Sequence, residues 1–164
     1  MELLVIRHGT AEEAKPGVDD SQRSLTKEGR KEMKKAAAGL TRLVENIDII
    51  AASPLVRAQQ TAEIVAASYD DLAIETLDSL SPGSDLGDLA NWLRQQSSAE
   101  VVAVVGHEPH LGTLVTWLMT GAGNSRVAMS KAGAALLEFS SSVSEGSGVL
   151  QWLATGSTLR RLRK

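Results

Sequence analysis

Cysteine is absent from this chain of 164 residues, which excludes disulfide bonds and thiolate metal sites. Long apolar runs are also missing, because no stretch approaches the roughly 20 residues that a membrane-spanning helix needs. Met1 leads directly into a short apolar run and a charged motif, without the basic and apolar regions of a secretory leader. We therefore expect a cytoplasmic protein that does not enter a membrane.

An excess of positive charge is lacking as well. The chain has 17 basic and 20 acidic residues, and its formal net charge is -3. Nothing in this balance attracts nucleic acid, and the basic tail at residues 159–164 is typical of a solvated chain end. We expect no nucleic-acid partner, so any phosphate group must be bound by a local cluster of cations.

The length and composition suit one domain that spans residues 1–164, since 43% of the residues are hydrophobic and can form a core. Short, continuously apolar runs predict buried strands, and capping residues followed by apolar positions at helical spacing predict helices between them. The predicted strands are residues 2–7, 47–52, 73–77, 101–105, 132–140 and 149–155. The predicted helices run from Thr26 to near Asn46, from Ser53-Pro54 to residue 66, over residues 85–95, and onward from Pro109.

The alternation of strands and helices indicates an α/β fold with three layers, in which helices cover both faces of a mostly parallel sheet. The last two strands are expected to pair antiparallel at one edge of that sheet. Ligands of such sheets bind at the carboxyl ends of the strands. The motifs that follow the predicted strands therefore indicate the function.

Basic side chains and histidines follow three of the predicted strands. The first strand runs into Arg7, His8 and Gly9, the second is followed by Arg57, and the 101–105 strand is followed by His107. The planar forks of two arginines match the oxygens of a phosphate, and their charge persists at neutral pH. A neutral histidine can attack phosphorus through one ring nitrogen while the other donates to a fixed acceptor. Glycine after it removes a Cβ from a crowded turn.

Three motifs carry a resemblance to a known family. They are Arg7-His8-Gly9, the run Ser53-Pro54-Leu55-Val56-Arg57-Ala58-Gln59-Gln60-Thr61-Ala62, and Gly106-His107, in this order and each at a predicted strand end. Together they resemble the histidine phosphatase superfamily, which includes phosphoglycerate mutases and acid phosphatases. The small size, Arg23-Ser24-Leu25-Thr26-Lys27-Glu28-Gly29 and Val105-Gly106-His107-Glu108-Pro109 are similar to SixA-type phosphohistidine phosphatases.

This resemblance implies a phosphoglycerate mutase-like fold and a catalytic set of His8, Arg7, Arg57 and His107. His8 would be the phosphorylated nucleophile, and the other three would bind phosphate and stabilise the transition state. Gly9 and Arg23 are further candidates for substrate binding, although Arg23 could instead brace the loop before the first helix.

Two features of larger relatives are missing. Those relatives carry a carboxylate donor after the third strand and a large helical lid, whereas this chain offers no convincing donor and little room for a lid. The open alternatives for a donor are Asp19, Asp20, Asp78 and Asp85. Glu108 could be an acid at the rim of the site but is interpreted as a solvated helix start, and His110 is interpreted as a surface residue. An imidazole leaves phosphorus more readily than an alkoxide, so a missing donor favours a phosphohistidine substrate.

The sequence thus predicts a phosphatase that hydrolyses phosphohistidine on a phosphotransfer protein through a covalent phosphohistidine intermediate. Two alternatives remain open: a phosphatase for small-molecule phosphate esters, which would use one of the aspartates as acid, and a catalytically silent phosphoprotein-binding module. We expect no metal and no cofactor, because no set of carboxylates and histidines has ligand spacing.

Overall fold

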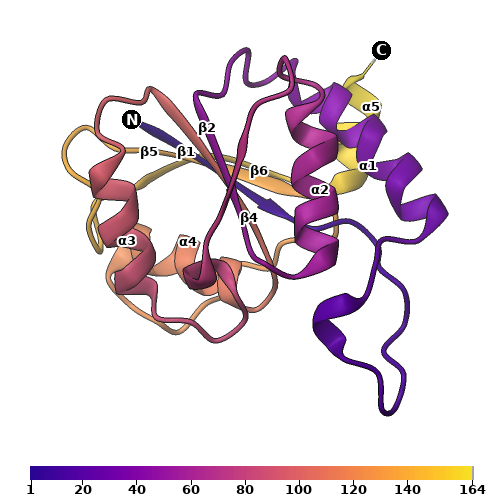
Figure 1. The fold of residues 1–164 in the computed structure, drawn as a ribbon. Helices are drawn as coiled ribbons and strands as arrows, with labels where there is room; N and C mark the ends of the chain where they lie inside the picture. Colours follow the sequence, from indigo (N-terminus) through magenta and orange to yellow (C-terminus); the bar gives the residue numbers. More distant parts are fainter. Residues whose placement is uncertain (164) are drawn as a thin grey trace.

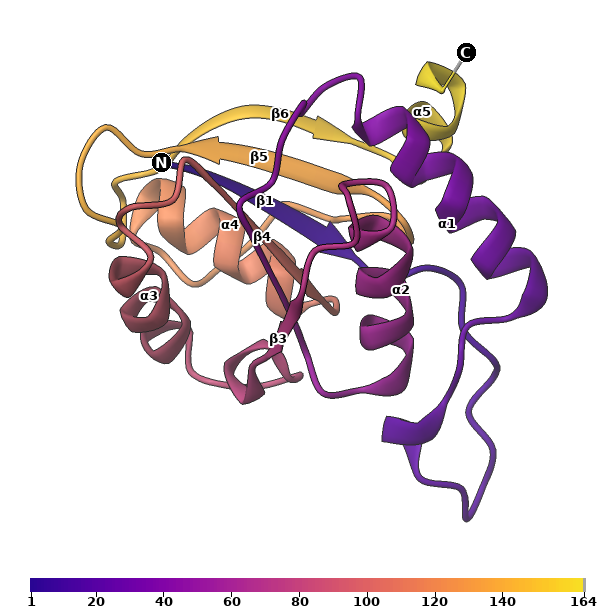
Figure 2. The same cartoon turned by 45° about the horizontal axis from the view of Figure 1, so that its top comes forward.

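The computed structural model describes residues 1–163, which form a six-stranded sheet covered by helices on both faces (Figure 1, Figure 2). The strand order is β3-β2-β4-β1-β5-β6. The first four strands of that order pair in parallel, and β5 and β6 complete the sheet as an antiparallel edge. The strands are β1 (Glu2–Arg7), β2 (Ile49–Ala52), β3 (Ile74–Thr76), β4 (Val101–Gly106), β5 (Ala134–Glu138) and β6 (Val149–Ala154). The helices are α1 (Lys27–Leu40), α2 (Val56–Ala66), α3 (Leu86–Gln95), α4 (His110–Thr120) and α5 (Gly156–Leu162), with 3-10 turns at Asp20–Gln22 and Asp78–Leu80.

Two hydrophobic clusters lie on opposite faces of the sheet. Leu4 and Ile6 of β1 pack with α1, α2 and α5 on one face, and Leu3 and Val5 pack with α3 and α4 on the other. This alternation follows from the two-residue period of a strand and explains why β1 is apolar at every inner position. The predicted fold class, three layers with a mostly parallel sheet and an antiparallel edge, is confirmed.

The parallel pairing also places the strand ends that matter beside one another. Arg7 at the end of β1 pairs with Gly106 at the end of β4, and Ala52 at the end of β2 pairs with Val105. The residues that follow these positions therefore meet at one edge of the sheet. Between β3 and β4 the chain contains only a 3-10 turn and α3, which packs on the sheet, so no large helical lid covers that edge.

Several predicted boundaries differ from the structure. Thr26 does cap α1, accepting the N–H of Gly29, but the helix ends at Leu40 and not near Asn46. The helix expected to start with Ser53 as its cap begins at Val56, and its N-cap residue Leu55 makes no side-chain cap bond.

The described cations of the basic tail are exposed or half-exposed, as expected, but the tail also contains a helix that the sequence pattern does not predict. Residues Gly156–Leu162 form α5, capped by Thr155, and its Leu159 is buried against α1. A Cβ at Gly39 of α1 would collide with the carbonyl of Leu159, so a glycine is needed for the two helices to approach so closely. Lys164 lies outside the described residues.

Among residues 1–163, no helix is both long enough and apolar enough to cross a membrane.

Candidate active site

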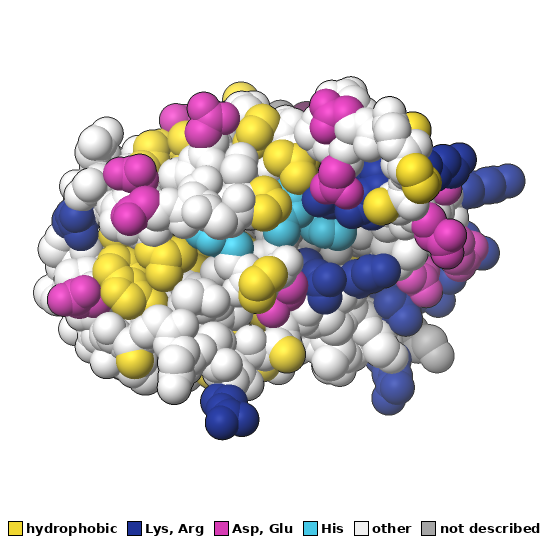
Figure 3. Space-filling model, turned by 90° about the horizontal axis from the view of Figure 1, so that it is seen from below, with side chains coloured by type: hydrophobic (Ala, Val, Ile, Leu, Met, Phe, Trp, Pro, Cys, Tyr) yellow, Lys and Arg dark blue, Asp and Glu magenta, His cyan; other side chains and the backbone are white. Residues whose placement is uncertain are grey.

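A polar pocket of about 250 Å³ lies at the carboxyl ends of β1, β2 and β4. The four residues predicted from the sequence to form the catalytic set all line it, and Figure 3 shows histidine side chains beside arginine and lysine side chains in the middle of this face. The lining residues are Arg7, His8, Ala11, Arg23, Arg57, Pro82, His107, Glu108 and Lys131.

The His8 ring is buried and held in one orientation. Its Nδ1 lies 2.7 Å from the carbonyl oxygen of Gly9. A carbonyl can only accept a hydrogen bond, so Nδ1 carries the hydrogen and Nε2 keeps its lone pair. Burial, which outweighs the opposing hydrogen bond to the Gly9 carbonyl and is supported by the Arg57 and Arg7 charges, lowers the pKa of His8 to about 4. His8 is therefore neutral and nucleophilic at neutral pH.

The turn that holds His8 is itself tied to α2. The N–H of Gly9 donates to Oγ1 of Thr61 at 3.1 Å, and that hydroxyl donates to the carbonyl of Arg57 at 2.7 Å. A Cβ on Gly9 would lie 3.4 Å from the Gly29 carbonyl oxygen. This is an ordinary van der Waals distance, so the structure does not require a glycine here for lack of space, and the N–H of Gly9 is engaged by Thr61.

His107 approaches the pocket from the end of β4. Its ring centroid lies 5.1 Å from that of His8, and its Nε2 is 2.8 Å from Oγ of Ser53. Its Nδ1 is buried and has no hydrogen-bond partner among residues 1–163. Burial lowers the pKa of His107 to about 3, with smaller contributions from His8 and Arg57 in the same direction. This ring is also neutral at physiological pH.

The two arginines are anchored through their terminal nitrogens. Arg7 donates from Nη1 to the carbonyl of Met129 at 2.8 Å. Arg57 donates from Nη1 to the carbonyl of Asp20 at 2.9 Å and from Nη2 to its Oδ2 at 3.0 Å. Within residues 1–163, Nε of Arg7 and Nε of Arg57 are buried without a partner. In each guanidinium, hydrogen bonds from the Nη atoms fix the group, and the buried Nε–H donor is left unpaired.

These unpaired nitrogens, together with Nδ1 of His107, belong to residues of one site. The buried side-chain nitrogens and oxygens that lack a partner in the described chain are three, namely Nε of Arg7, Nε of Arg57 and Nδ1 of His107, and all three residues line the same pocket. Unpaired buried donors are costly and rare in folded proteins. A pocket that collects them beside two arginine charges is suited to bind an oxyanion.

Arg23 and Asp20 connect the loop after His8 to this site. Arg23 donates from Nε to Oδ1 of Asp20 at 2.7 Å and from Nη1 to the carbonyl of Glu12 at 2.8 Å. Arg23 therefore does both things that the sequence left open, because it lines the pocket and braces the loop, which projects from the body in Figure 2. The hydrogen bond from Arg23, supported by the Arg57 charge, lowers the pKa of Asp20.

The other candidate acids lie away from the pocket lining. Asp19 accepts the N–H of Ser21, and Asp85 caps α3 by accepting the N–H of Gly87. Glu108, which the sequence suggested to be a solvated helix start, lines the pocket while its Oε1 accepts the N–H of Gly112 at 2.7 Å. Lys131 also lines it, and no motif around this residue in the sequence signals that position.

His110 was wrongly predicted to be a surface residue. It is only 7% exposed, and its Nε2 lies 3.2 Å from the carbonyl of Ser79. Burial lowers its pKa.

Among residues 1–163 no group of three or more His, Asp or Glu side chains is arranged to hold a metal ion.

Comparison with known proteins agrees with the resemblance to histidine phosphatases. The model of the histidine phosphatase superfamily (branch 1) matches residues 3–82. The phosphohistidine phosphatase SixA of Escherichia coli is 33% identical over 124 residues, which cover 74% of this chain and 76% of that protein. An uncharacterized protein of Picosynechococcus sp. is 34% identical over 135 residues, covering 81% of this chain and 82% of the relative.

Solved structures extend the likeness to almost the whole chain. The protein histidine phosphatase SixA complexed with tungstate superposes with a TM-score of 0.85 at 28% identity, covering 97% of this chain and 99% of that one. A phosphoserine phosphatase mutant of Entamoeba histolytica superposes with a TM-score of 0.72 at 18% identity, covering 96% and 98%, which shows a shared fold.

Proposed function

The chain belongs to the histidine phosphatase superfamily, as a SixA-type member, and from this premise we propose that it hydrolyses phosphohistidine on a phosphotransfer protein with His8 as nucleophile. A histidine-nucleophile phosphatase needs a neutral imidazole with a free lone pair next to a binding site for the phosphoryl oxygens. His8 offers that lone pair at Nε2, because Nδ1–H is bound to the Gly9 carbonyl.

One observation carries the assignment of the other residues. Nε of Arg7, Nε of Arg57 and Nδ1 of His107 are buried nitrogens without partners in the described chain, and their residues line the pocket that contains His8. A phosphoryl group bound in this pocket would bring acceptor oxygens next to these three residues. Donors that are fixed before the reaction stabilise charge that develops in the transition state, commonly by several kcal/mol.

The reaction then has two steps. Nε2 of His8 attacks phosphorus, and the bond between phosphorus and the substrate imidazole breaks. The substrate ring carries a proton on its other nitrogen, so it takes the bonding electrons and leaves as neutral imidazole, while His8, which keeps Nδ1–H, becomes a phosphorylated imidazolium. Water next attacks the phosphorus on His8, and the bond to Nε2 breaks, which releases inorganic phosphate and restores the neutral ring. Arg7, Arg57 and His107 hold the equatorial oxygens in both steps.

The surroundings of the pocket favour a protein-bound phosphoramidate over an alkyl ester. Glu108 is the one carboxylate among the lining residues, and it already accepts the N–H of Gly112. Asp20 is engaged by two arginines, which favours its ionised form. A substrate whose leaving group needs little protonation suits these carboxylates, and the absence of a large lid leaves room for a folded protein.

A phosphatase for small phosphate esters is the competing assignment, and a substrate panel separates the two. The purified protein is incubated with a histidine-phosphorylated phosphotransfer domain, with an aryl phosphate and with alkyl phosphates such as phosphoserine. We expect the highest kcat/KM on the phosphoprotein, a lower value on the aryl phosphate and little turnover of alkyl phosphates. Efficient turnover of an alkyl phosphate together with an inert phosphoprotein would contradict the proposal.

A further inference from the structure

Ser53 is a buried polar residue that the mechanism above does not use. It follows directly after β2 and is fully buried. Its N–H donates to the carbonyl of Val105 at 3.0 Å, and its own carbonyl accepts a hydrogen bond from Nε2 of Gln59 at 2.8 Å. The backbone of Ser53 is therefore fixed on both sides. The predicted capping role does not account for this residue, because α2 begins only at Val56.

The hydroxyl of Ser53 has two neighbours in the described chain. The N–H of Leu55 approaches Oγ at 3.3 Å as a donor, and Nε2 of His107 lies 2.8 Å from Oγ. A hydroxyl has one hydrogen to give and can accept two. If Nε2 of His107 carried a hydrogen, Oγ would accept twice and its own hydrogen would have no acceptor among residues 1–163. A buried donor left in that way is destabilising.

The opposite arrangement pairs the Ser53 hydroxyl and Nε2 of His107 and leaves only Nδ1 of His107 without a partner in the described chain. Leu55 N–H donates to Oγ of Ser53, the hydroxyl donates to Nε2 of His107, and the single hydrogen of the neutral ring sits on Nδ1. Nδ1 is the buried atom that has no partner in residues 1–163. We propose that Ser53 is a positioning residue that fixes His107 as the Nδ1–H tautomer, so that this ring offers a hydrogen bond to the phosphoryl group.

The same tautomer then has opposite effects in two neighbouring rings. In His8 the hydrogen on Nδ1 is used by the Gly9 carbonyl, and the pocket receives the lone pair of Nε2. In His107 the Nε2 lone pair is used by Ser53, and the hydrogen on Nδ1 is left without a partner in the described chain. One ring can attack phosphorus while the other donates to its oxygens. The inference rests on the proposed role of this site, but the tautomer itself can be measured without any substrate.

His110 supplies an internal reference for that measurement. Its Nε2 faces the carbonyl of Ser79, which can only accept, so His110 is the Nε2–H tautomer. Long-range proton–nitrogen correlation spectra of the ¹⁵N-labelled protein near neutral pH distinguish protonated from unprotonated ring nitrogens. Single His→Gln variants assign each ring. We expect Nδ1–H for His8 and His107 and Nε2–H for His110.

The variant Ser53→Ala removes the donor to Nε2. We expect the His107 resonances to move toward a mixture of both tautomers while those of His8 and His110 stay in place. We also expect kcat on an aryl phosphate to fall roughly 10- to 100-fold, less than for complete loss of one oxyanion donor, because His107 still samples Nδ1–H. Ser53→Cys, with a thiol of similar shape that donates weakly, should lie between the two.

Ser68→Ala is the matched control, because this exposed hydroxyl at the end of α2 bonds only the carbonyl of Ile64. It should change neither the spectra nor turnover. A wild-type spectrum with the hydrogen on Nε2 of His107 would overturn the proposal even if Ser53→Ala fails to fold, and so would an Ala variant with unaltered His107 resonances. Neither result would contradict the assignment of His8 as nucleophile, which the substrate panel tests.

Discussion

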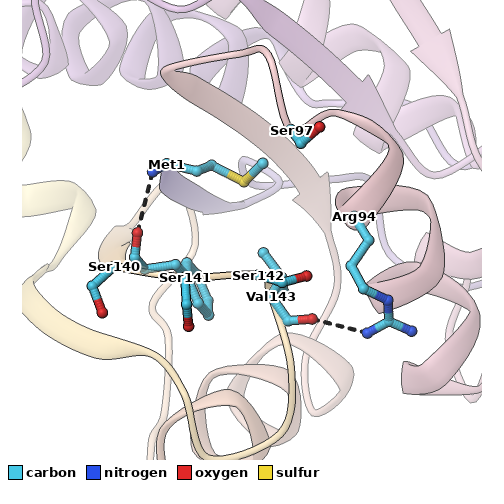
Figure 4. A pocket seen from close by; sticks show the side chains of 8 residues that line it. Met1, Arg94, Ser97, Ser140, Ser141, Ser142 and Val143 are labelled. Carbon is cyan, nitrogen blue, oxygen red and sulfur yellow. Dashed lines mark hydrogen bonds between the residues drawn. The ribbon is translucent and has the colours of Figure 1, made fainter.

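Two pockets of similar size lie at opposite ends of the sheet and differ in how their donors are paired. The pocket at the carboxyl ends of the parallel strands has a volume of about 250 Å³, and its Arg7, Arg57 and His107 each keep a buried nitrogen without a partner in the described chain. The pocket beside Met1, where β1 begins, has about 280 Å³ (Figure 4). There Arg94 donates to the Val143 carbonyl at 2.8 Å and also bonds Asn91.

The difference shows why volume alone does not identify a site. In the pocket beside Met1 the terminal amine is satisfied as well, since it donates to the carbonyl of Phe139 at 3.2 Å. The hydrogen-bond donors beside Met1 are paired within the protein and stabilise the fold. The unpaired nitrogens around His8 are left for a bound ligand. Matched changes in the two pockets should therefore have very different consequences.

The largest contrast is expected between two arginines. Arg57→Ala should lower kcat/KM about a thousandfold or more, because a buried charge that faces transition-state oxygens contributes several kcal/mol. Arg94→Ala should change it less than about twofold, since Arg94 is exposed and far from the chemistry. Arg57→Lys should recover only part of the rate, because lysine keeps the charge but loses the Nε donor. If Arg57→Ala and Arg94→Ala lowered kcat/KM equally, the proposed difference between the two pockets would be wrong.

A second contrast concerns pH. The lowered pKa of His8, about 4, means that its lone pair is present above that pH and is lost as the pH falls through it. An unperturbed histidine would lose the lone pair near about pH 6.5. We expect kcat on bound substrate to stay level from neutral pH to about pH 5 and then to fall about tenfold per unit. A fall centred near 6.5, with the fold intact by circular dichroism, would show that His8 is not buried as described.

Among the residues that line the pocket around His8, the smallest effect is expected for the carboxylate Glu108. Glu108→Gln keeps an oxygen that can accept the N–H of Gly112, and phosphohistidine turnover should stay within about tenfold of the parent because imidazole departs without a strong general acid. Initial rates on the phosphoprotein and on an aryl phosphate check this expectation. A hundredfold loss with an unchanged melting temperature would identify Glu108 as a proton donor.

Much of this site could be predicted because each residue follows a strand whose apolar pattern is unambiguous. β1 and β4 were predicted to within one residue, which placed Arg7, His8 and His107 at one edge, and the turn after β2 did the same for Arg57. Local patterns could not reveal contacts that depend on packing. Asp20 meets Arg57 across 37 positions of the chain, and Thr61 meets Gly9 across 52.

The errors have the same origin. His110 was assigned to the surface because it lies off the apolar stripe of its helix, yet the 3-10 turn before α3 covers it through the Ser79 carbonyl. The last helix, α5, was missed because its sequence is mostly basic and its one buried leucine, Leu159, gives no apolar pattern. Leu159 packs against α1, where Gly39 has no Cβ to collide with its carbonyl. In both places tertiary neighbours, and not the local sequence, decide what is buried.

The central claim is that Nε2 of His8 takes up the phosphoryl group while the unpaired donors hold its oxygens. It is tested most directly by mixing the protein with a ³²P-phosphohistidine phosphotransfer domain, quenching in alkali within the first turnover, and mapping the label by mass spectrometry. We predict acid-labile, alkali-stable phosphate on His8, reduced labelling in Arg57→Ala, and neither label nor turnover in His8→Ala. Undiminished turnover by His8→Ala, or label on any other residue, would contradict the account.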